Sequence, residues 1–259
     1  MKLLPAVSGS LRSWVRQLPL VRRLGPAVGR WLGPLWLDNP DGLRCVLARK
    51  FITGAGIEIG ALNQPQTVRR SAQVQYVDRM PLDQLQAHYP NVRGMRWVDI
   101  VDDGEALHTV SDGSQDFVIA NHFLEHAQNP IGTLRRFLSV VRPGGVVFLA
   151  VPDMRGTFDW DRPLTTLAHL FRDDAEGAAW SYQAHIEEFV YLAMRQSGAE
   201  AEATIEHFRR TNYSIHYHVW THDSFGDLLR ALQPRLGFSV LAHVYSSANS
   251  ETVCVLQKA

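Results

Sequence analysis

The sequence predicts an α/β protein built on a doubly wound parallel sheet, and three observations carry this prediction. Short apolar segments alternate with amphipathic ones from residue 55 onward. Acidic or polar residues directly follow several of the apolar segments, and a Gly-containing turn precedes the apolar run at 146–151. Alternation of this kind is typical of strands connected by helices in a parallel sheet. The chain has 259 residues, enough for one sizeable core, and 46% of them are hydrophobic.

Each element is predicted from its own pattern. Apolar runs bounded by polar or Gly-containing turns give the strands, which are expected at 57–59, 74–78, 96–98, 115–120, 146–151, 238–244 and 252–256. Amphipathic spacing gives the helices, which are expected at 81–88, 131–140, 183–195 and after a cap at Thr221 or Asp223. The last helix is expected to bury Phe225, Leu228, Leu229 and Leu232 on one face.

The chain is predicted to have two parts. Residues 1–40 form a basic segment containing Trp and Pro, and residues 41–259 form the main domain, with 154–220 as a mostly helical insertion over the carboxyl edge of the sheet. Residues 1–37 hold six basic and no acidic side chains. Basic segments rich in Trp suit peripheral contact with an anionic membrane surface. The alternatives are an N-terminal cap packed on the domain and an Arg-rich transit peptide.

The composition of the chain argues against several classes of function and location. The whole chain has 26 basic and 26 acidic residues and a formal net charge of zero, so nucleic-acid binding is not expected. Cys45 and Cys254 show neither metal-binding nor redox spacing, which favours a reducing compartment. No run approaches the ~20 apolar residues of a membrane span, and no secretory signal is evident. The expected location is the cytoplasm, with the inner face of the membrane added if residues 1–40 bind lipid.

Three acidic residues lie at or just after three consecutive predicted strands. Glu58 precedes Gly60, Asp78 ends the second strand, and Asp103 follows the third. A carboxylate in the position of Asp78 can accept hydrogen bonds from both ribose hydroxyls. A dinucleotide requires a complete G-x-G-x-x-G, and the run 60–65 has only its first glycine. The acids therefore favour adenosine with a positively charged tail and disfavour a nicotinamide-dependent oxidoreductase.

The chain resembles class I S-adenosylmethionine-dependent methyltransferases of the type-11 kind. The resemblance rests on 58–60, Asp78, the acidic turn 102–105, the runs 111–118 and 122–126, and Arg-Pro-Gly-Gly at 142–145. It implies a Rossmann-like seven-stranded sheet with the last strand antiparallel. It also implies S-adenosylmethionine as cofactor, with Gly60 near the methionine part, Asp78 at the ribose and Asp103 near adenine. The full set of expected cofactor contacts is Glu58, Gly60, Ala61, Asp78, Arg79, Asp103, Gly104, Asn121 and His122.

The missing glycines after Gly60 depart from the family pattern and leave the methionine-side contacts open. A second, looser resemblance concerns the segments 159–166 and 216–221, which are similar to methyltransferase-domain proteins encoded among bacterial glycosyltransferases. This resemblance favours a small-molecule or glycan acceptor, and in particular a sugar hydroxyl.

Methyl transfer to a hydroxyl needs a group that takes up its proton. The predicted catalytic residues are His122, Asp153, His216 and His218. His126 is a weaker candidate, because the same run recurs in methyltransferases with diverse acceptors. No metal site is predicted, although Asp153, Asp159, Asp161, His185, His216 and His218 offer suitable ligand atoms.

The sequence therefore favours an S-adenosylmethionine-dependent enzyme that O-methylates a sugar hydroxyl of a surface glycan or glycolipid. The alternative is a non-catalytic module with the methyltransferase fold that assembles at membranes through residues 1–40.

Overall fold

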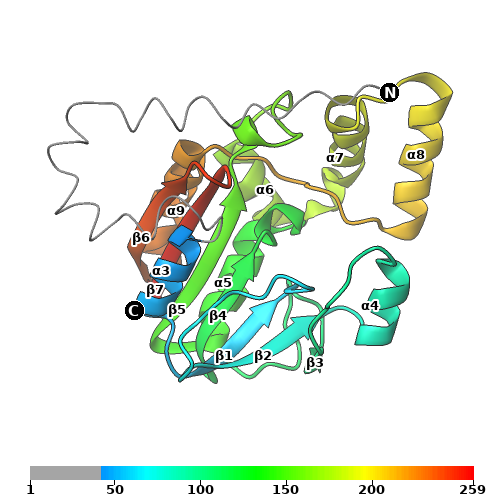
Figure 1. The fold of residues 1–259 in the computed structure, drawn as a ribbon. Helices are drawn as coiled ribbons and strands as arrows, with labels where there is room; N and C mark the ends of the chain where they lie inside the picture. Colours follow the sequence, from blue (N-terminus) through cyan, green and yellow to red (C-terminus); the bar gives the residue numbers. More distant parts are fainter. Residues whose placement is uncertain (1–41) are drawn as a thin grey trace, which may run out of the picture. The chain divides into compact units, whose positions relative to one another are not determined.

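The computed structural model describes residues 42–259, and residues 44–259 form one compact unit. Seven strands form a single sheet in the order β3-β2-β1-β4-β5-β7-β6 (Figure 1). β7 is antiparallel to both of its neighbours, and the other adjacent pairs are parallel. The strands are β1 (Ala55–Ile59), β2 (Gln73–Asp78), β3 (Ile100–Val101), β4 (Gln115–Asn121), β5 (Val141–Pro152), β6 (Phe238–Ser246) and β7 (Glu251–Lys258).

This arrangement confirms the predicted α/β, doubly wound, Rossmann-like sheet with an antiparallel last strand. The chain runs outward from β1 through β2 to β3 and then returns to place β4 on the other side of β1. The strand order thus reverses between β1 and β4. In open α/β sheets, ligands bind outside the carboxyl ends of the strands at such a reversal.

Within the described part of the chain, the four predicted helices are present, and three more α-helices occur, one before the first strand and two in the insertion that was predicted to be mostly helical. They are α3 (Gly42–Phe51), α4 (Leu82–His88), α5 (Pro130–Val140), α6 (Leu167–Glu176), α7 (Tyr182–Glu188), α8 (Gly198–Thr211) and α9 (His222–Leu236). Of the two predicted caps, Thr221 and Asp223, it is Thr221 that caps α9, and Thr221 forms a capping box with Ser224. Buried residues of α5, α6 and α9 form one hydrophobic core with the central strands. These helices therefore hold the sheet, and with it the ends of its strands, in place.

Among the strands, the largest shifts from the predicted starting positions occur at the third and fifth strands. The third strand lies at Ile100–Val101 and not at 96–98, because Asp99 turns back to accept a hydrogen bond from the Tyr76 amide (2.8 Å) before pairing begins. β5 begins at Val141, which pairs with Gln115 ahead of an irregularity in the register. The Pro-Gly-Gly turn is therefore contained in the strand and does not precede it.

The predicted insertion contains α6, α7, α8 and a π-helical turn, η4 (Phe189–Ala193), which interrupts the helix expected over 183–195. The insertion has a small core of its own, formed by Ile186, Val190, Ala201, Ile205, Phe208, Ile215 and Tyr217. Figure 1 shows α7 and α8, in yellow, standing together apart from the sheet. Within residues 42–259, no helix combines the length and apolar character that crossing a membrane requires. The predicted membrane contact of residues 1–40 lies outside the described residues.

Candidate functional site

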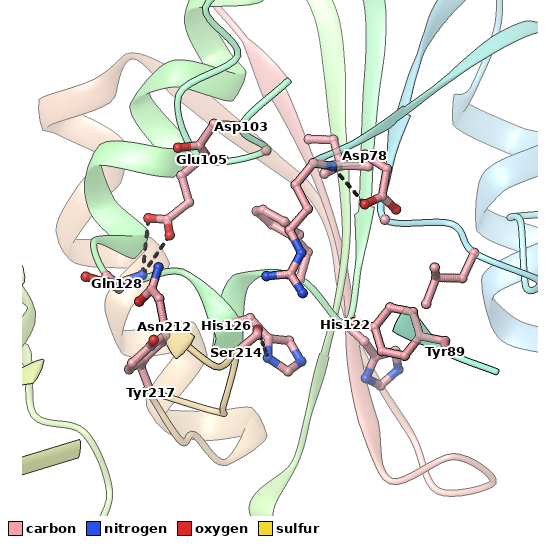
Figure 2. A pocket seen from close by; sticks show the side chains of 16 residues that line it. Asp78, Tyr89, Asp103, Glu105, His122, His126, Gln128, Asn212, Ser214 and Tyr217 are labelled. Atoms are coloured by element: carbon pink, nitrogen blue, oxygen red, sulfur yellow. Dashed lines mark hydrogen bonds between the residues drawn. The ribbon is translucent and has the colours of Figure 1, made fainter. Parts of the chain in front are cut away.

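A cavity of about 530 Å³ lies at the carboxyl ends of the strands, at the reversal of strand order. This volume falls within the range of ~300–1,000 Å³ typical of small-molecule sites. Figure 2 shows Asp78 on one side of the cavity and Gln128, Asn212 and Tyr217 on the other. The lining comprises Ile59, Gly60, Leu62, Asp78, Arg79, Tyr89, Asp103, Gly104, Glu105, His122, Phe123, His126, Gln128, Asn212, Ser214 and Tyr217. The sheet thus supplies one wall and the insertion contributes to the other.

The three carboxylates of the acidic turn after β3 have different contacts. Asp102 accepts hydrogen bonds from the amide and hydroxyl of Thr109, both at 2.7 Å, and so holds the turn. Asp103 lines the cavity. Glu105 also lines it and accepts hydrogen bonds from the amides of Gln128 and Asn129, which join the turn to the start of α5. Burial raises the pKa of Glu105 above its ordinary value.

Two glycines in the lining are favoured by the local structure. Gly60 directly follows β1 with φ +65°, a conformation that favours glycine. A Cβ on Gly104 would lie 2.6 Å from Phe123 and 2.8 Å from Ile59. Gly60 is therefore favoured for its conformation, and Gly104 is required by its close packing on Phe123 and Ile59.

Asp78 ends β2, and its side chain faces the cavity. Its Oδ1 accepts a hydrogen bond from the Arg79 amide (2.8 Å), which orients the carboxylate at the strand end. Burial raises the pKa of Asp78, although the hydrogen bonds and charge of Arg79 oppose the shift. The Arg79 guanidinium also lines the cavity and lies 3.3 Å from His88 Nε2. The structure thus brings six predicted cofactor residues together here, namely Gly60, Asp78, Arg79, Asp103, Gly104 and His122.

His122 lies directly after β4 in the left-handed region, with φ +50°, and its ring lines the cavity. Its Nε2 is 2.8 Å from Glu251 Oε2, and its Nδ1 is 3.4 Å from Glu125 Oε1. Burial alone would lower the pKa of His122, but the hydrogen bonds and charges of the two glutamates outweigh burial and raise it to about 9. The ring is therefore protonated at neutral pH. A cation with both nitrogens engaged does not accept a proton, so the prediction of His122 as a general base is not supported.

The paired His122 makes the stability of the protein depend on pH. The folded-state pKa of about 9 lies above the ordinary value of 6.5. The pair therefore stabilises the fold fully below pH 6.5 and loses that contribution as the pH rises toward 9. We expect the unfolding temperature to fall across this range, with a smaller fall in His122→Gln, whose amide does not titrate. Equal pH dependence of the two proteins in thermal unfolding would contradict this assignment.

His126 also lines the cavity, at the end of the short helix Leu124–His126 that follows His122. Its Nδ1 lies 2.9 Å from the Ile215 carbonyl. The same nitrogen lies 3.2 Å from the Ser214 hydroxyl, a contact that Figure 2 shows. Since a carbonyl only accepts, Nδ1 carries the proton and Nε2 is left as the basic nitrogen. Burial lowers the pKa of His126, so the ring is neutral at pH 7. These properties suit a proton acceptor, a role for which the sequence favoured other residues.

Three predicted cofactor residues do not line this cavity. Glu58 is buried, and its Oε1 accepts a hydrogen bond from the Gln66 amide (2.7 Å). Asn121 donates to Gln66 Oε1 (3.1 Å) from the neighbouring strand. Glu58 and Asn121 therefore both anchor Gln66, in the loop after β1. Burial raises the pKa of Glu58 to about 7. Ala61 faces a small cleft beside β2 and α4.

Three predicted catalytic residues also lie outside the lining. Asp153 is fully buried, and its carboxylate accepts hydrogen bonds from the Arg155 side chain and from the His222 amide (2.8 Å). It thereby caps the start of α9 and does not face the crevice as expected. His216 Nδ1 is 2.7 Å from Asp159 Oδ2, with its ring packed on His126.

His218 is fully buried beside His185 and His169. In this segment Tyr217, between the two histidines, lines the cavity. Successive side chains of an extended segment point to opposite sides. Which side of this segment faces the cavity depends on how the segment packs on the domain, and the sequence alone does not give that packing.

The comparisons with known proteins agree with this geometry. A family model described as a methyltransferase domain matches residues 24–233. The chain belongs to this family. Its cofactor is S-adenosylmethionine, as the sequence motifs indicate.

Similar proteins include the ubiquinone biosynthesis O-methyltransferase of Xanthomonas campestris pv. campestris (strain B100), which is 32% identical over 122 residues. The match covers 45% of this chain and 51% of that protein, so the chain spans about half the length of the curated relatives it matches. Among solved structures, one proposed to be a zinc-dependent alcohol dehydrogenase of Rhodobacter sphaeroides is 14% identical, with a TM-score of 0.52. That match covers 86% of this chain and 90% of that one and shows the fold alone.

The residues of the cavity fit the methyltransferase cofactor. Ile59, Gly104 and Phe123 give the cavity an apolar lining beside Asp103, and the Asp78 carboxylate is placed to accept hydrogen bonds from a ribose diol. Asp103 and Glu105 add negative charge, which suits a ligand with a positive sulfonium and opposes a pyrophosphate. Gly60, Asp78, Asp103 and Gly104 would hold the cofactor, and Arg79 and His122 would meet its carboxylate end.

Proposed function

We propose that this methyltransferase O-methylates a hydroxyl group, and that the acceptor is a sugar of a surface glycan or glycolipid. The observation that carries the proposal is the neutral, anchored imidazole of His126 in the wall of the cavity. A hydroxyl is a weak nucleophile until its proton is removed, and a positioned histidine contributes roughly 10²–10⁴-fold to such a step.

The residues divide the reaction between them. When bound, the cofactor would supply a methyl group on a sulfonium. His126 Nε2 would take the proton of the acceptor hydroxyl as the hydroxyl oxygen receives that methyl group. The Ile215 carbonyl holds the Nδ1 proton, which fixes the tautomer that this step requires.

The sugar preference rests on the side chains around His126. Gln128, Asn212, Ser214 and Tyr217 all line this part of the cavity and offer amide and hydroxyl groups. Neighbouring hydroxyls of a sugar need several such partners, since a buried polar group without a hydrogen bond is costly. A phenolic hydroxyl is the second candidate, because the curated relative is named as an O-methyltransferase of ubiquinone biosynthesis.

An acceptor panel tests the proposal. The full chain is incubated with S-adenosylmethionine and either glycolipids and nucleotide sugars or catechols, and release of S-adenosylhomocysteine is measured. We expect turnover with a sugar acceptor and a methoxy group on the product by mass spectrometry. Turnover with catechols alone would replace the sugar by a phenol, and transfer to nitrogen or carbon alone would overturn O-methylation.

A further inference from the structure

A second group of chemically active side chains lies in the insertion, outside the cavity lining. His169 and Asp173 come from α6, His185 from α7, and His218 from the segment that leads to α9. One ligand atom from each of the four lies within 4.8 Å of the other three, although the residues span 50 positions of the sequence. Asp173, His185 and His218 are buried, and His169 is partly exposed. None of these four side chains takes part in the proposed reaction.

The distances between the ligand atoms suit a single small cation. His169 Nε2 is 3.0 Å from His185 Nε2 and 3.1 Å from Asp173 Oδ2. His218 Nε2 is 3.8 Å from the same Asp173 oxygen. A tetrahedral zinc site with ligand distances of ~2.0–2.1 Å has neighbouring ligand atoms about 3.3 Å apart. The four side chains already approximate this spacing.

Two buried atoms of the cluster lack hydrogen-bond partners among the described residues. They are Asp173 Oδ2 and His218 Nδ1, and both side chains are fully buried. The other Asp173 oxygen accepts a hydrogen bond from the Ser181 hydroxyl (2.9 Å), which orients the carboxylate toward the histidines. A buried carboxylate oxygen without a hydrogen bond is costly. The His169 Nε2 atom 3.1 Å away offsets this cost only when the ring is protonated, whereas a cation bound among the imidazoles would offset it with all three rings neutral.

We propose that His169, Asp173, His185 and His218 bind one zinc ion. Three neutral imidazoles and a carboxylate are ligands that zinc takes, and four protein ligands leave no open position, as in structural sites. The sequence did not predict this site, since only His185 and His218 were among its candidate ligands and the i,i+4 pair from α6 was missed. The proposal does not depend on the identity of the methyl acceptor.

The proposed site would lock the insertion against the wall of the cavity. His218 directly follows Tyr217, which lines the cavity. Its Nε2 is 3.3 Å from the carbonyl of Gln128, another lining residue, and zinc on this nitrogen would replace that hydrogen bond. Zinc would thus tie α6 and α7 to the segment that carries Tyr217. Its contribution would be to order this wall and not to activate the acceptor.

Metal content and thermal unfolding of the full-length chain test the proposal. After equilibration in a zinc buffer and removal of free metal, we expect about one zinc ion per chain by elemental mass spectrometry, and a lower unfolding temperature after chelation that zinc restores. Asp173→Asn keeps the size of the side chain and a partner for Ser181, and His169→Ala alters the most exposed ligand. Both variants should lose the zinc and its effect on unfolding.

The matched control is His207→Ala, which removes an exposed histidine of α8. It should keep the zinc of the unmodified chain. Failure of the unmodified chain to take up zinc, or its failure to take up cobalt(II) with the visible absorption of a tetrahedral complex, would overturn the proposal. Retention of zinc by both ligand variants would overturn it as well. Because these readouts need no methyl acceptor, they separate this proposal from the proposed function.

Discussion

Asp78→Ala is expected to weaken the binding of S-adenosylmethionine by about 10²–10⁴-fold. The carboxylate ends β2 at the rim of the cavity and is oriented by the Arg79 amide. Two hydrogen bonds from ribose hydroxyls to a charged group contribute roughly 1.5–3 kcal/mol each, and every ~1.4 kcal/mol is a factor of ten in the dissociation constant. Isothermal titration calorimetry with the cofactor measures the change directly.

The control for this variant is Asp227→Ala, which removes an exposed carboxylate of α9 that does not line the cavity. It should bind the cofactor as the unmodified chain does. Thermal unfolding of both variants separates lost binding from lost folding. Unchanged cofactor affinity in a folded Asp78→Ala protein would remove the ribose assignment.

His126→Ala is expected to lower turnover by about 10²–10⁴-fold while leaving cofactor affinity nearly unchanged. The imidazole is the neutral base that the cavity offers, with its tautomer set by the Ile215 carbonyl. Burial holds the pKa of His126 below its ordinary value of 6.5. The rate of the unmodified enzyme should therefore be level at neutral pH and fall as the pH drops through that lowered pKa. Single-turnover rates measured against pH test both expectations.

Two comparisons make this test specific. His207→Ala, on the surface of α8, should keep full turnover. His122→Gln should keep the acidic fall in rate, since that fall belongs to His126. Full turnover by a folded His126→Ala protein with any hydroxyl acceptor would exclude the proton-acceptor role.

The sheet and the cofactor side of the cavity were predictable because they depend on local pattern and on strand ends. Asp78, Asp103 and Gly104 occupy positions where a parallel sheet places its ligands whatever the surrounding sequence. The acceptor side depends on the register of coil segments. His216 and His218 flank Tyr217, and the sequence does not say which of the three faces inward.

Asp153 failed as a catalytic prediction for a related reason. Its position at the end of β5 is the one the sequence indicates. The amide of His222, 69 residues later in the chain, takes up one carboxylate oxygen, and Arg155 contacts both. A strand-end acid therefore either meets a ligand or caps a neighbouring element, and only the tertiary contacts decide between the two.

The histidine after β4 has a wider consequence. Its positive charge is held between Glu125, three residues away, and Glu251, 129 residues away on the antiparallel strand at the far side of β5. The polarity of the ligand chamber is thus set partly by a hairpin that contributes nothing to its walls. If the strands that line the cavity were transferred to another protein without that hairpin, the cavity would keep its lining residues, but His122 would lose Glu251 as its counter-ion. The binding site therefore depends on both parts of the sheet.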